Sequence, residues 1–221
     1  MTQTPLKILI VGTGRCGTGY LARCLESAGF RCGHEAIFNH WDEDTVRGNL
    51  LRSTFDAESS WAAAAFLGAE WLGTEVKVIH LTRSPKAVIK SFFDINFFSD
   101  GRVQKPLNQV VYRNTSIRAE SQARLASSVA HYYEWNAMIV AKLAGAKQPS
   151  LQLRLEDLVD NSLSVDALSR FIGAPVVLPA EVANRKVKEK LAMQGECYDE
   201  QAALGLMKAA SERYGNFGYA L

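Results

Sequence analysis

The sequence predicts an α/β fold of three layers, with a four- or five-stranded parallel sheet and a helical C-terminal part. Two observations lead to this prediction. Short aliphatic runs alternate with longer segments whose apolar residues recur at helical spacing. A glycine-rich turn joins the first aliphatic run to the first helical segment. Because 221 residues are enough for one α/β domain, we expect a single domain over residues 1–221.

Composition places the chain among ordinary globular proteins. Hydrophobic residues make up 48% of the sequence and charged residues 22%, and the net charge of +2 is too small to suggest a nucleic-acid partner. No apolar run is long enough to span a bilayer or to act as a secretory signal. The four cysteines have neither metal-site nor disulfide spacing, which favours free thiols. We therefore expect a cytoplasmic protein that binds no nucleic acid, no membrane and no metal.

The first three predicted elements form a strand, helix, strand unit. Residues 6–11 are almost entirely aliphatic and have strand length, as expected of a central parallel strand buried on both faces. A helix is predicted over 18–28, where apolar residues recur at helical spacing. Residues 30–34 are a plausible second strand. The order predicts that the first two strands are parallel.

The middle of the chain continues the alternation. The alanine-rich segment 61–71 predicts a helix, and residues 76–81 are the clearest third strand. Ser84 and Pro85 then supply an N-cap and a proline at the first helical position, which predicts a helix through about Phe93.

The second half of the chain is predicted to be mostly helical. Residues 94–115 lack a strong period and contain Gly and Pro, so loops are expected there. A long amphipathic helix is predicted over 119–143 and a fourth strand over 151–155, with further helices near 165–172 and 199–214.

The glycine-rich segment GTGRCGTG, residues 12–19, has the flanks of a phosphate-binding loop. Glycines allow the backbone to turn sharply and to expose successive N–H groups to an anion. The N-terminus of the following helix adds a partial positive charge. The sequence therefore predicts a phosphate cradle between the first strand and the first helix.

Two nucleotide-binding alternatives match part of this loop. Gly12 and Gly17 are spaced as in nucleotide-triphosphate loops, but Thr18 replaces the lysine and Gly19 the hydroxyl that holds magnesium, so an ATP-dependent small-molecule or nucleotide kinase is the weaker interpretation. The glycines also fit a dinucleotide fingerprint, with Glu35 as the ribose-binding acid. A non-catalytic nucleotide-binding protein therefore stays open as well.

The segment ILIVGTGRCGTGYL resembles the 5′-phosphosulfate loop of sulfotransferases that use 3′-phosphoadenosine 5′-phosphosulfate (PAPS), in outline those of the bacterial and carbohydrate type. The resemblance implies a P-loop fold and PAPS as donor, with 3′,5′-ADP as product. It implies that Arg15 reaches the oxygen that bridges phosphorus and sulfur, and that the Thr18 hydroxyl binds the 5′-phosphate. The backbone amides implied in the same site are those of Gly14, Arg15, Cys16, Gly17, Thr18 and Gly19.

A second resemblance lies in VIHLTRSPKAVIKSFF. Family members carry an arginine at the end of the third strand and a serine eight residues later, and both bind the 3′-phosphate. Arg83 and Ser91 fall on these positions. The carboxyl end of a parallel strand is the edge where open α/β sheets bind ligands, and a guanidinium donates two hydrogen bonds to a phosphate at once.

A general base is expected directly after the second strand. The resemblance to sulfotransferases with a catalytic glutamate there favours Glu35 as base, with His34 second. Alternatively, Glu35 caps a helix or pairs with Arg15, and His34 is a core residue. Weaker candidates for a catalytic role are His40, His80 and His131, and His80 is expected in the core.

Several features are assigned more loosely. Tyr132, Tyr133 and Trp135 are expected to pack along the long helix, and Glu156 is expected to be structural. Family members often close the nucleotide pocket with a late basic loop. Arg185 and Lys186 match it only in charge, and a solvated charge run is the alternative. The expected acceptor is a small molecule or a carbohydrate, which the sequence does not identify further, and the oligomeric state is left open.

Overall fold

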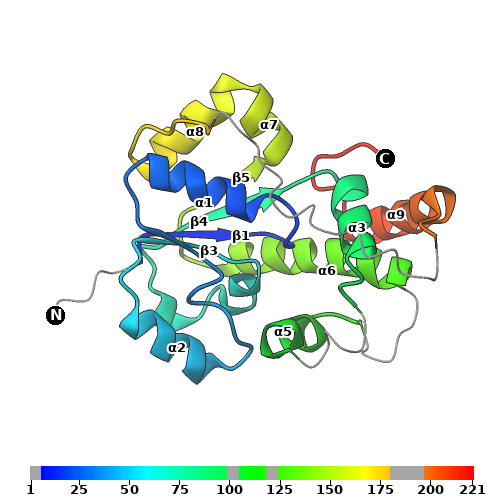
Figure 1. Ribbon diagram of the computed structural model, residues 1–221, viewed down its shortest axis with the longest axis horizontal. Helices are drawn as coiled ribbons and strands as arrows, with labels where there is room; N and C mark the ends of the chain where they lie inside the picture. The colour runs from blue at the N-terminus through cyan, green and yellow to red at the C-terminus, as the bar shows by residue number, and fades with distance from the viewer. Residues whose placement is uncertain (1–5, 99–104, 118–123, 180–196) are drawn as a thin grey trace.

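The computed structural model describes residues 6–98, 105–117, 124–179 and 197–221 (Figure 1). Its strands form one sheet of five parallel strands in the order β2-β3-β1-β4-β5, which confirms the predicted parallel sheet. The strands are β1 (Ile8–Val11), β2 (Cys32–His34), β3 (Ala57–Ser59), β4 (Lys77–Thr82) and β5 (Ser150–Arg154).

Helices cover both faces of the sheet, so the predicted three-layer α/β architecture is confirmed. In Figure 1, α1, α7 and α8 lie on one face and α6 crosses the other, while α9 packs against α6. The helices are α1 (Thr18–Ser27), α2 (Glu43–Arg52), α3 (Pro85–Asp94), α5 (Pro106–Asn114), α6 (Arg124–Gly145), α7 (Leu155–Asp160), α8 (Ser162–Ile172) and α9 (Glu200–Tyr214), with the 3-10 helices η1 (Ala62–Phe66) and η2 (Glu70–Leu72). None of the helices in the described ranges is both long and apolar enough to cross a membrane.

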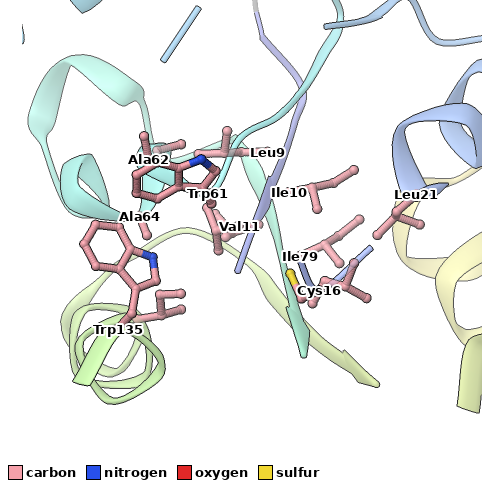
Figure 2. Close-up of a cluster of buried hydrophobic side chains, with 14 of the residues drawn as sticks. Leu9, Ile10, Val11, Cys16, Leu21, Trp61, Ala62, Ala64, Ile79 and Trp135 are labelled. Atoms are coloured by element: carbon pink, nitrogen blue, oxygen red, sulfur yellow. The ribbon is translucent and has the colours of Figure 1, made fainter. Parts of the chain in front are cut away.

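The central strand β1 is buried on both faces, as its aliphatic sequence predicts. Every residue from Ile8 to Val11 is at most 1% exposed. Figure 2 shows the alternation that two-sided burial requires: Leu9 and Val11 point to the side of Trp135, and Ile10 points to the side of Leu21. The sheet therefore has a core on each side, and the loop after β1 emerges between two packed layers.

The main correction to the predicted sheet is β3, which lies between β1 and β2. The first two predicted strands are parallel, but both pair with β3 instead of with each other. The strand ends in Glu58 and Ser59 and is followed by Ser60, and the polar character of this run hides the strand from a search for aliphatic strands. All three residues are nevertheless fully buried. Oε1 of Glu58 and the two serine hydroxyls form hydrogen bonds with backbone groups of neighbouring segments.

The remaining corrections concern short helices. The segment 61–71 forms η1 and η2 instead of one α-helix, with Gly68 at a φ of 82° between them. The loop expected over 94–115 contains α5, because Pro106 stands at the first helical position, where proline is tolerated. Neither α2 nor α7 was predicted, and α7 begins at Leu155, where the fourth strand was predicted to end. The described part of α6 begins at Arg124, and the predicted start at 119 lies outside the described residues.

Candidate functional site

The glycine-rich loop lies between β1 and α1, at the carboxyl end of the sheet's central strand. Its backbone is left-handed at Gly14 (φ 77°), Arg15 (φ 55°) and Gly17 (φ 102°). Gly17 is the N-cap of α1 and has no side chain that caps the helix, and the first turn of α1 contains no acidic residue. The loop is therefore a concave backbone next to a helix N-terminus, which is the arrangement that binds anions.

Close packing around the loop leaves no room for larger residues. A Cβ atom added to Gly12 would lie 2.5 Å from the backbone oxygen of Leu81 and 2.6 Å from the Cys16 sulfur. At Gly14 it would lie 3.3 Å from Cγ of Trp61. Cys16 is fully buried, and burial raises the pKa of its thiol. Of Cys16, only the backbone amide is therefore suited to meet a bound anion, as the sequence analysis expected.

Three of the predicted site residues meet beside this loop. Nε of Arg15 donates a hydrogen bond of 2.8 Å to the Ser91 hydroxyl on α3. Nη1 of Arg83, directly after β4, donates to the backbone oxygen of Arg15 at 3.2 Å. The sequence analysis expected Arg15 at the phosphosulfate and Arg83 with Ser91 at the 3′-phosphate. In the structure these residues form one connected cluster, which we call the arginine cluster, and all three are partly exposed.

Side chains of helix α6 form hydrogen bonds with backbone oxygens of the loop and of the arginine cluster. The Trp135 indole donates to the backbone oxygen of Gly12 at 3.0 Å, and Nε2 of His131 contacts the backbone oxygen of Thr13 at 2.8 Å. The Tyr132 hydroxyl donates to the backbone oxygen of Arg83 at 2.9 Å. In a trans peptide the carbonyl and the next N–H point in opposite directions. Bonding the Gly12 and Thr13 oxygens to α6 therefore turns the N–H groups of Thr13 and Gly14 away from α6.

His131 holds this position as a neutral imidazole. It is fully buried, and burial lowers its pKa to about 4. A carbonyl oxygen only accepts, so Nε2 carries the proton and Nδ1 is the bare nitrogen. Nδ1 has no hydrogen-bond partner among the described residues. His80 is also buried, and its Nε2 lies 2.9 Å from Oδ1 of Asn136, so the prediction of a core residue is confirmed for His80.

The start of α3 is held by Glu156 of α7, which the C-terminal segment of the chain contacts in turn. The backbone N–H of Ser84 donates to Oε1 of Glu156 at 2.9 Å, and the Tyr219 hydroxyl donates to Oε2 at 2.8 Å. Burial acts to raise the pKa of Glu156, but these two hydrogen bonds and the charge of Arg83 outweigh it and lower the pKa. An ionised Glu156 thus fixes the backbone next to Arg83.

The two candidate bases follow β2. His34 is exposed, which contradicts the alternative that it is a core residue, and its Nε2 lies 3.4 Å from the Thr18 hydroxyl. A Cβ added to Gly19 would lie 3.5 Å from the His34 ring. Glu35 is partly exposed, its φ is 56°, and its N–H donates to the backbone oxygen of Ser59 at 3.0 Å. The structure thus places the strand end that carries both candidates beside the start of α1.

Two further points complete the comparison with the predicted site. Arg185 and Lys186 lie outside the described residues. Among the residues that are described, no group of three or more His, Cys, Asp or Glu side chains is arranged to hold a metal ion. The sequence analysis missed the hydrogen bonds from His131, Tyr132 and Trp135 to the loop and the arginine cluster, because helical periodicity shows which face is buried but not which backbone atoms that face meets.

Comparisons with known proteins give structural likeness only. No protein-family model matches the sequence, and no curated protein matches it either. The structure is similar to a sulfotransferase from Alicyclobacillus acidocaldarius, with a TM-score of 0.56, 14% identity, and coverage of 95% of this chain and 94% of that one. It is also similar to the sulfotransferase domain of the Synechococcus PCC 7002 olefin synthase, with a TM-score of 0.52, 15% identity, and coverage of 100% and 90%.

A mouse sulfotransferase, SULT7A1 complexed with PAP, matches at a TM-score of 0.41 and 14% identity, over 95% of this chain and 66% of that one. This score is too low to support an argument. The first two similarities show that the chain has the sulfotransferase-type fold, as the sequence analysis expected. At these identities the likeness concerns the fold, and function has to be argued from the site.

Proposed function

We propose that this protein is a sulfotransferase that moves a sulfuryl group from PAPS to a hydroxyl or amine of a small-molecule or carbohydrate acceptor. The observation that carries the proposal is the arginine cluster: Arg15, Arg83 and Ser91 meet at one edge of a sheet that has the sulfotransferase-type fold. Two guanidinium groups and a hydroxyl beside a glycine loop suit a donor with two separate anionic groups.

The donor's 5′ end binds to the glycine loop. The backbone amides from Gly14 to Gly19 and the Thr18 hydroxyl hold the 5′-phosphate, supported by the N-terminus of α1. Arg15 contacts the oxygen that bridges phosphorus and sulfur, where negative charge accumulates as the bond to sulfur breaks. In the structure Nε of Arg15 bonds to Ser91. Because both side chains have donor groups for an anion, we expect the bound donor to replace this bond.

The 3′-phosphate binds to Arg83 and Ser91. Arg83 follows β4, and Ser91 lies two turns into α3, so both face the carboxyl edge of the sheet. The hydrogen bonds that Tyr132 and Glu156 make to residues 83 and 84 hold this backbone in place before the donor arrives. Such pre-organisation lowers the entropy cost of binding.

Transfer is an in-line displacement with Glu35 as general base and His34 as the second candidate. The acceptor oxygen or nitrogen attacks sulfur, and its proton passes to the base. The bond between sulfur and the bridging oxygen breaks, and its electron pair stays on 3′,5′-ADP, beside Arg15. The contact between His34 and Thr18 supports this placement, because it brings the end of β2 next to the phosphate-binding turn.

A thermal-shift series tests the proposal. The ligands are 3′,5′-ADP, 5′-AMP as a matched compound without the 3′-phosphate, ATP with magnesium, and NAD. We expect 3′,5′-ADP to give the largest rise in melting temperature, because a ligand that binds only the native state stabilises it. The Arg83→Ala variant should lose the preference for 3′,5′-ADP over 5′-AMP. Arg170→Ala, an exposed change on α8, should keep it.

The series also separates the alternatives. A larger response to ATP with magnesium would favour a kinase, and a larger response to NAD would favour a dinucleotide-binding protein. No response to any of the four ligands would overturn the donor site altogether. If 3′,5′-ADP is preferred, incubation with sulfur-labelled PAPS and mixed carbohydrate and small-molecule acceptors should then identify the labelled product. The buried free thiols Cys16, Cys24 and Cys32 fit the further expectation of a cytoplasmic enzyme.

A further inference from the structure

A buried carboxyl group lies under the segment that carries the candidate bases. Glu58 is in β3, and the register places it between Leu9 of β1 and Gly33 of β2. Its side chain is fully buried. Carboxylates are almost never fully buried unless they are paired with a charge or hydrogen-bonded, so the burial of Glu58 requires an explanation.

The partners of Glu58 are backbone groups directly after Glu35. Oε1 of Glu58 accepts hydrogen bonds from the N–H groups of Ala36 at 2.7 Å and Ile37 at 3.0 Å. The next two residues complete the contact: the Ser59 backbone oxygen accepts from the Glu35 N–H, and the Ser60 hydroxyl donates to the Phe38 oxygen. The end of β3 and the residue after it thus hold the turn 35–38 at both of its ends.

These bonds enclose a strained residue. Glu35 has a φ of 56°, a left-handed conformation that side chains other than glycine rarely adopt. Such conformations persist only where the surrounding structure over-determines them, and they cluster at functional sites. The bond from the Glu35 N–H to Ser59 and the two bonds to Glu58 lie on either side of this residue.

We propose that Glu58 is a positioning residue for the candidate base: its carboxyl group holds the turn 35–38 and thereby the left-handed backbone of Glu35. The catalytic meaning of this assignment rests on the proposed function. The hydrogen bonds themselves do not depend on it, so the role can be tested without donor or acceptor.

The second oxygen of Glu58 makes this role sensitive to pH. Oε2 has no hydrogen-bond partner in the described structure, and it lies so close to Gly33 that an added Cβ would be 2.0 Å away. Burial raises the pKa of Glu58 to about 7, the backbone N–H bonds oppose this rise, and the Glu35 carboxylate adds to it. On β2, the flanking titratable groups are His34 and Cys32, and burial raises the pKa of the Cys32 thiol to about 12, so it stays neutral.

We therefore expect the charge of Glu58 to change near neutral pH. Opening of the turn would hydrate this carboxyl, so a pKa that is raised in the closed turn means that ionisation favours opening. We expect the turn 35–38 to open more readily above pH 7 than below it.

Amide hydrogen exchange of the whole chain, followed residue by residue by NMR, tests the proposal. In Glu58→Leu no acceptor remains for the Ala36 and Ile37 N–H groups, so at pH 5.5 both amides should exchange roughly tenfold faster than in the wild type. In Glu58→Gln a neutral acceptor replaces the carboxyl, so the two amides should exchange much as in the wild type at pH 5.5. At pH 8, after correction for intrinsic exchange rates, they should exchange more slowly in Glu58→Gln than in the wild type. Asp56→Asn is the matched control, because that carboxylate accepts from the Arg31 N–H outside the turn, and it should leave both amides unchanged.

Wild-type exchange of the two amides in Glu58→Leu would overturn the proposal. If neither variant folds, the wild type still decides. A ¹³C titration of its Glu58 carboxyl should coincide with a change in amide protection at Ala36 and Ile37, and a titration without that change overturns the role. Once an acceptor is known, kcat/KM of the wild type should show a step near pH 7 that Glu58→Gln lacks. If 3′,5′-ADP does not raise the melting temperature but the amides of Ala36 and Ile37 exchange as expected, only the proposed function is contradicted.

Discussion

Arg15 combines two features that are rarely found together in an ordinary loop residue. Its backbone is left-handed although it is not glycine, and its side chain reaches across to Ser91 on another element. Its carbonyl oxygen accepts from Arg83 at the same time. The backbone conformation lets the loop turn and expose its amides, and the guanidinium brings a positive charge to the same point. A side chain so placed is suited to stabilise a leaving phosphate.

Replacement of Arg15 should therefore harm both binding and turnover. We expect Arg15→Ala to lower kcat by about a hundredfold or more, which is typical of losing one group that stabilises transition-state charge, and to weaken binding of 3′,5′-ADP. Steady-state kinetics with labelled PAPS and isothermal titration with 3′,5′-ADP measure the two effects. Arg170→Ala, which removes an exposed arginine on α8, is the control for the loss of one positive charge. Unchanged kinetics in Arg15→Ala would mean that the loop assignment is wrong.

Replacement of Glu35 should lower turnover and leave donor binding unchanged. Glu35→Gln keeps the size of the side chain but removes its ability to take a proton, so kcat should fall by about a hundredfold or more. The melting-temperature rise caused by 3′,5′-ADP should match that of the wild type. His34→Gln is the companion variant, because His34 is the second candidate base. Wild-type turnover in Glu35→Gln together with a large loss in His34→Gln would transfer the role to the histidine.

At the scale of elements, α6 acts as the platform of the site. Three side chains of this helix form hydrogen bonds with backbone oxygens of the glycine loop and of the strand end at Arg83. They belong to His131, Tyr132 and Trp135. Because β1 and β4 are neighbours in the sheet, one helix can reach the ends of both. The two segments that we propose to bind the donor's anionic groups are thereby held by a single rigid element.

Replacing His131 should weaken ligand binding as well as stability, whereas replacing a histidine of the core should lower stability alone. His131→Phe leaves the buried Thr13 oxygen unpaired, which costs about 1–3 kcal/mol of stability, and it also frees the loop backbone, so 3′,5′-ADP should bind more weakly. His80→Phe is the matched control, since His80 is a buried histidine whose hydrogen bond goes to the Asn136 side chain of α6 and not to a loop carbonyl. It should lose stability in urea unfolding but retain its affinity. Equal affinity losses in both variants would reduce the role of His131 to general packing.

At the scale of the whole molecule, two buried groups should make stability depend on pH in opposite directions. The pKa of Glu58 is raised from 4.5 to about 7 in the folded state, so its contribution is full below pH 4.5 and is lost as the pH rises through 7. The pKa of His131 is lowered from 6.5 to about 4, so its contribution is present above pH 6.5 and is lost as the pH falls through 4. Between these limits the two effects oppose each other.

Glu58→Gln should remove only the first of these effects. Because each pKa unit corresponds to about 1.4 kcal/mol, the free energy of unfolding of the variant, relative to the wild type, should rise by roughly 3 kcal/mol between pH 4.5 and pH 8. Urea unfolding of both proteins at the two pH values measures this difference, in which the His131 effect cancels. A constant difference between variant and wild type would show that Glu58 does not titrate in this range.

The predictions from sequence succeeded where a pattern is local. The run of β1, the glycine loop and α1 was predicted because aliphatic burial, glycine spacing and helical periodicity follow one another without interruption. The segment from β4 through Arg83 to α3 was predicted for the same reason, with Ser84 and Pro85 marking the helix start. Two elements were missed because some of their residues are typical of loops. In α5 this residue is its first proline, and in β3 the residues are Glu58 and the serines that follow it.

The sequence by itself determined the class of fold and the order of the segments that we propose to bind phosphate, since these depend on neighbouring residues and on the period of their hydrophobicity. Only the tertiary structure decided which side chains meet. Arg15 and Ser91 are 76 residues apart, and His131 and the Thr13 oxygen are 118 apart. No local period encodes such pairs, because they form only when strands and helices from distant parts of the chain pack against a common sheet. The same packing turned a buried glutamate in β3 into the support of the turn at Glu35.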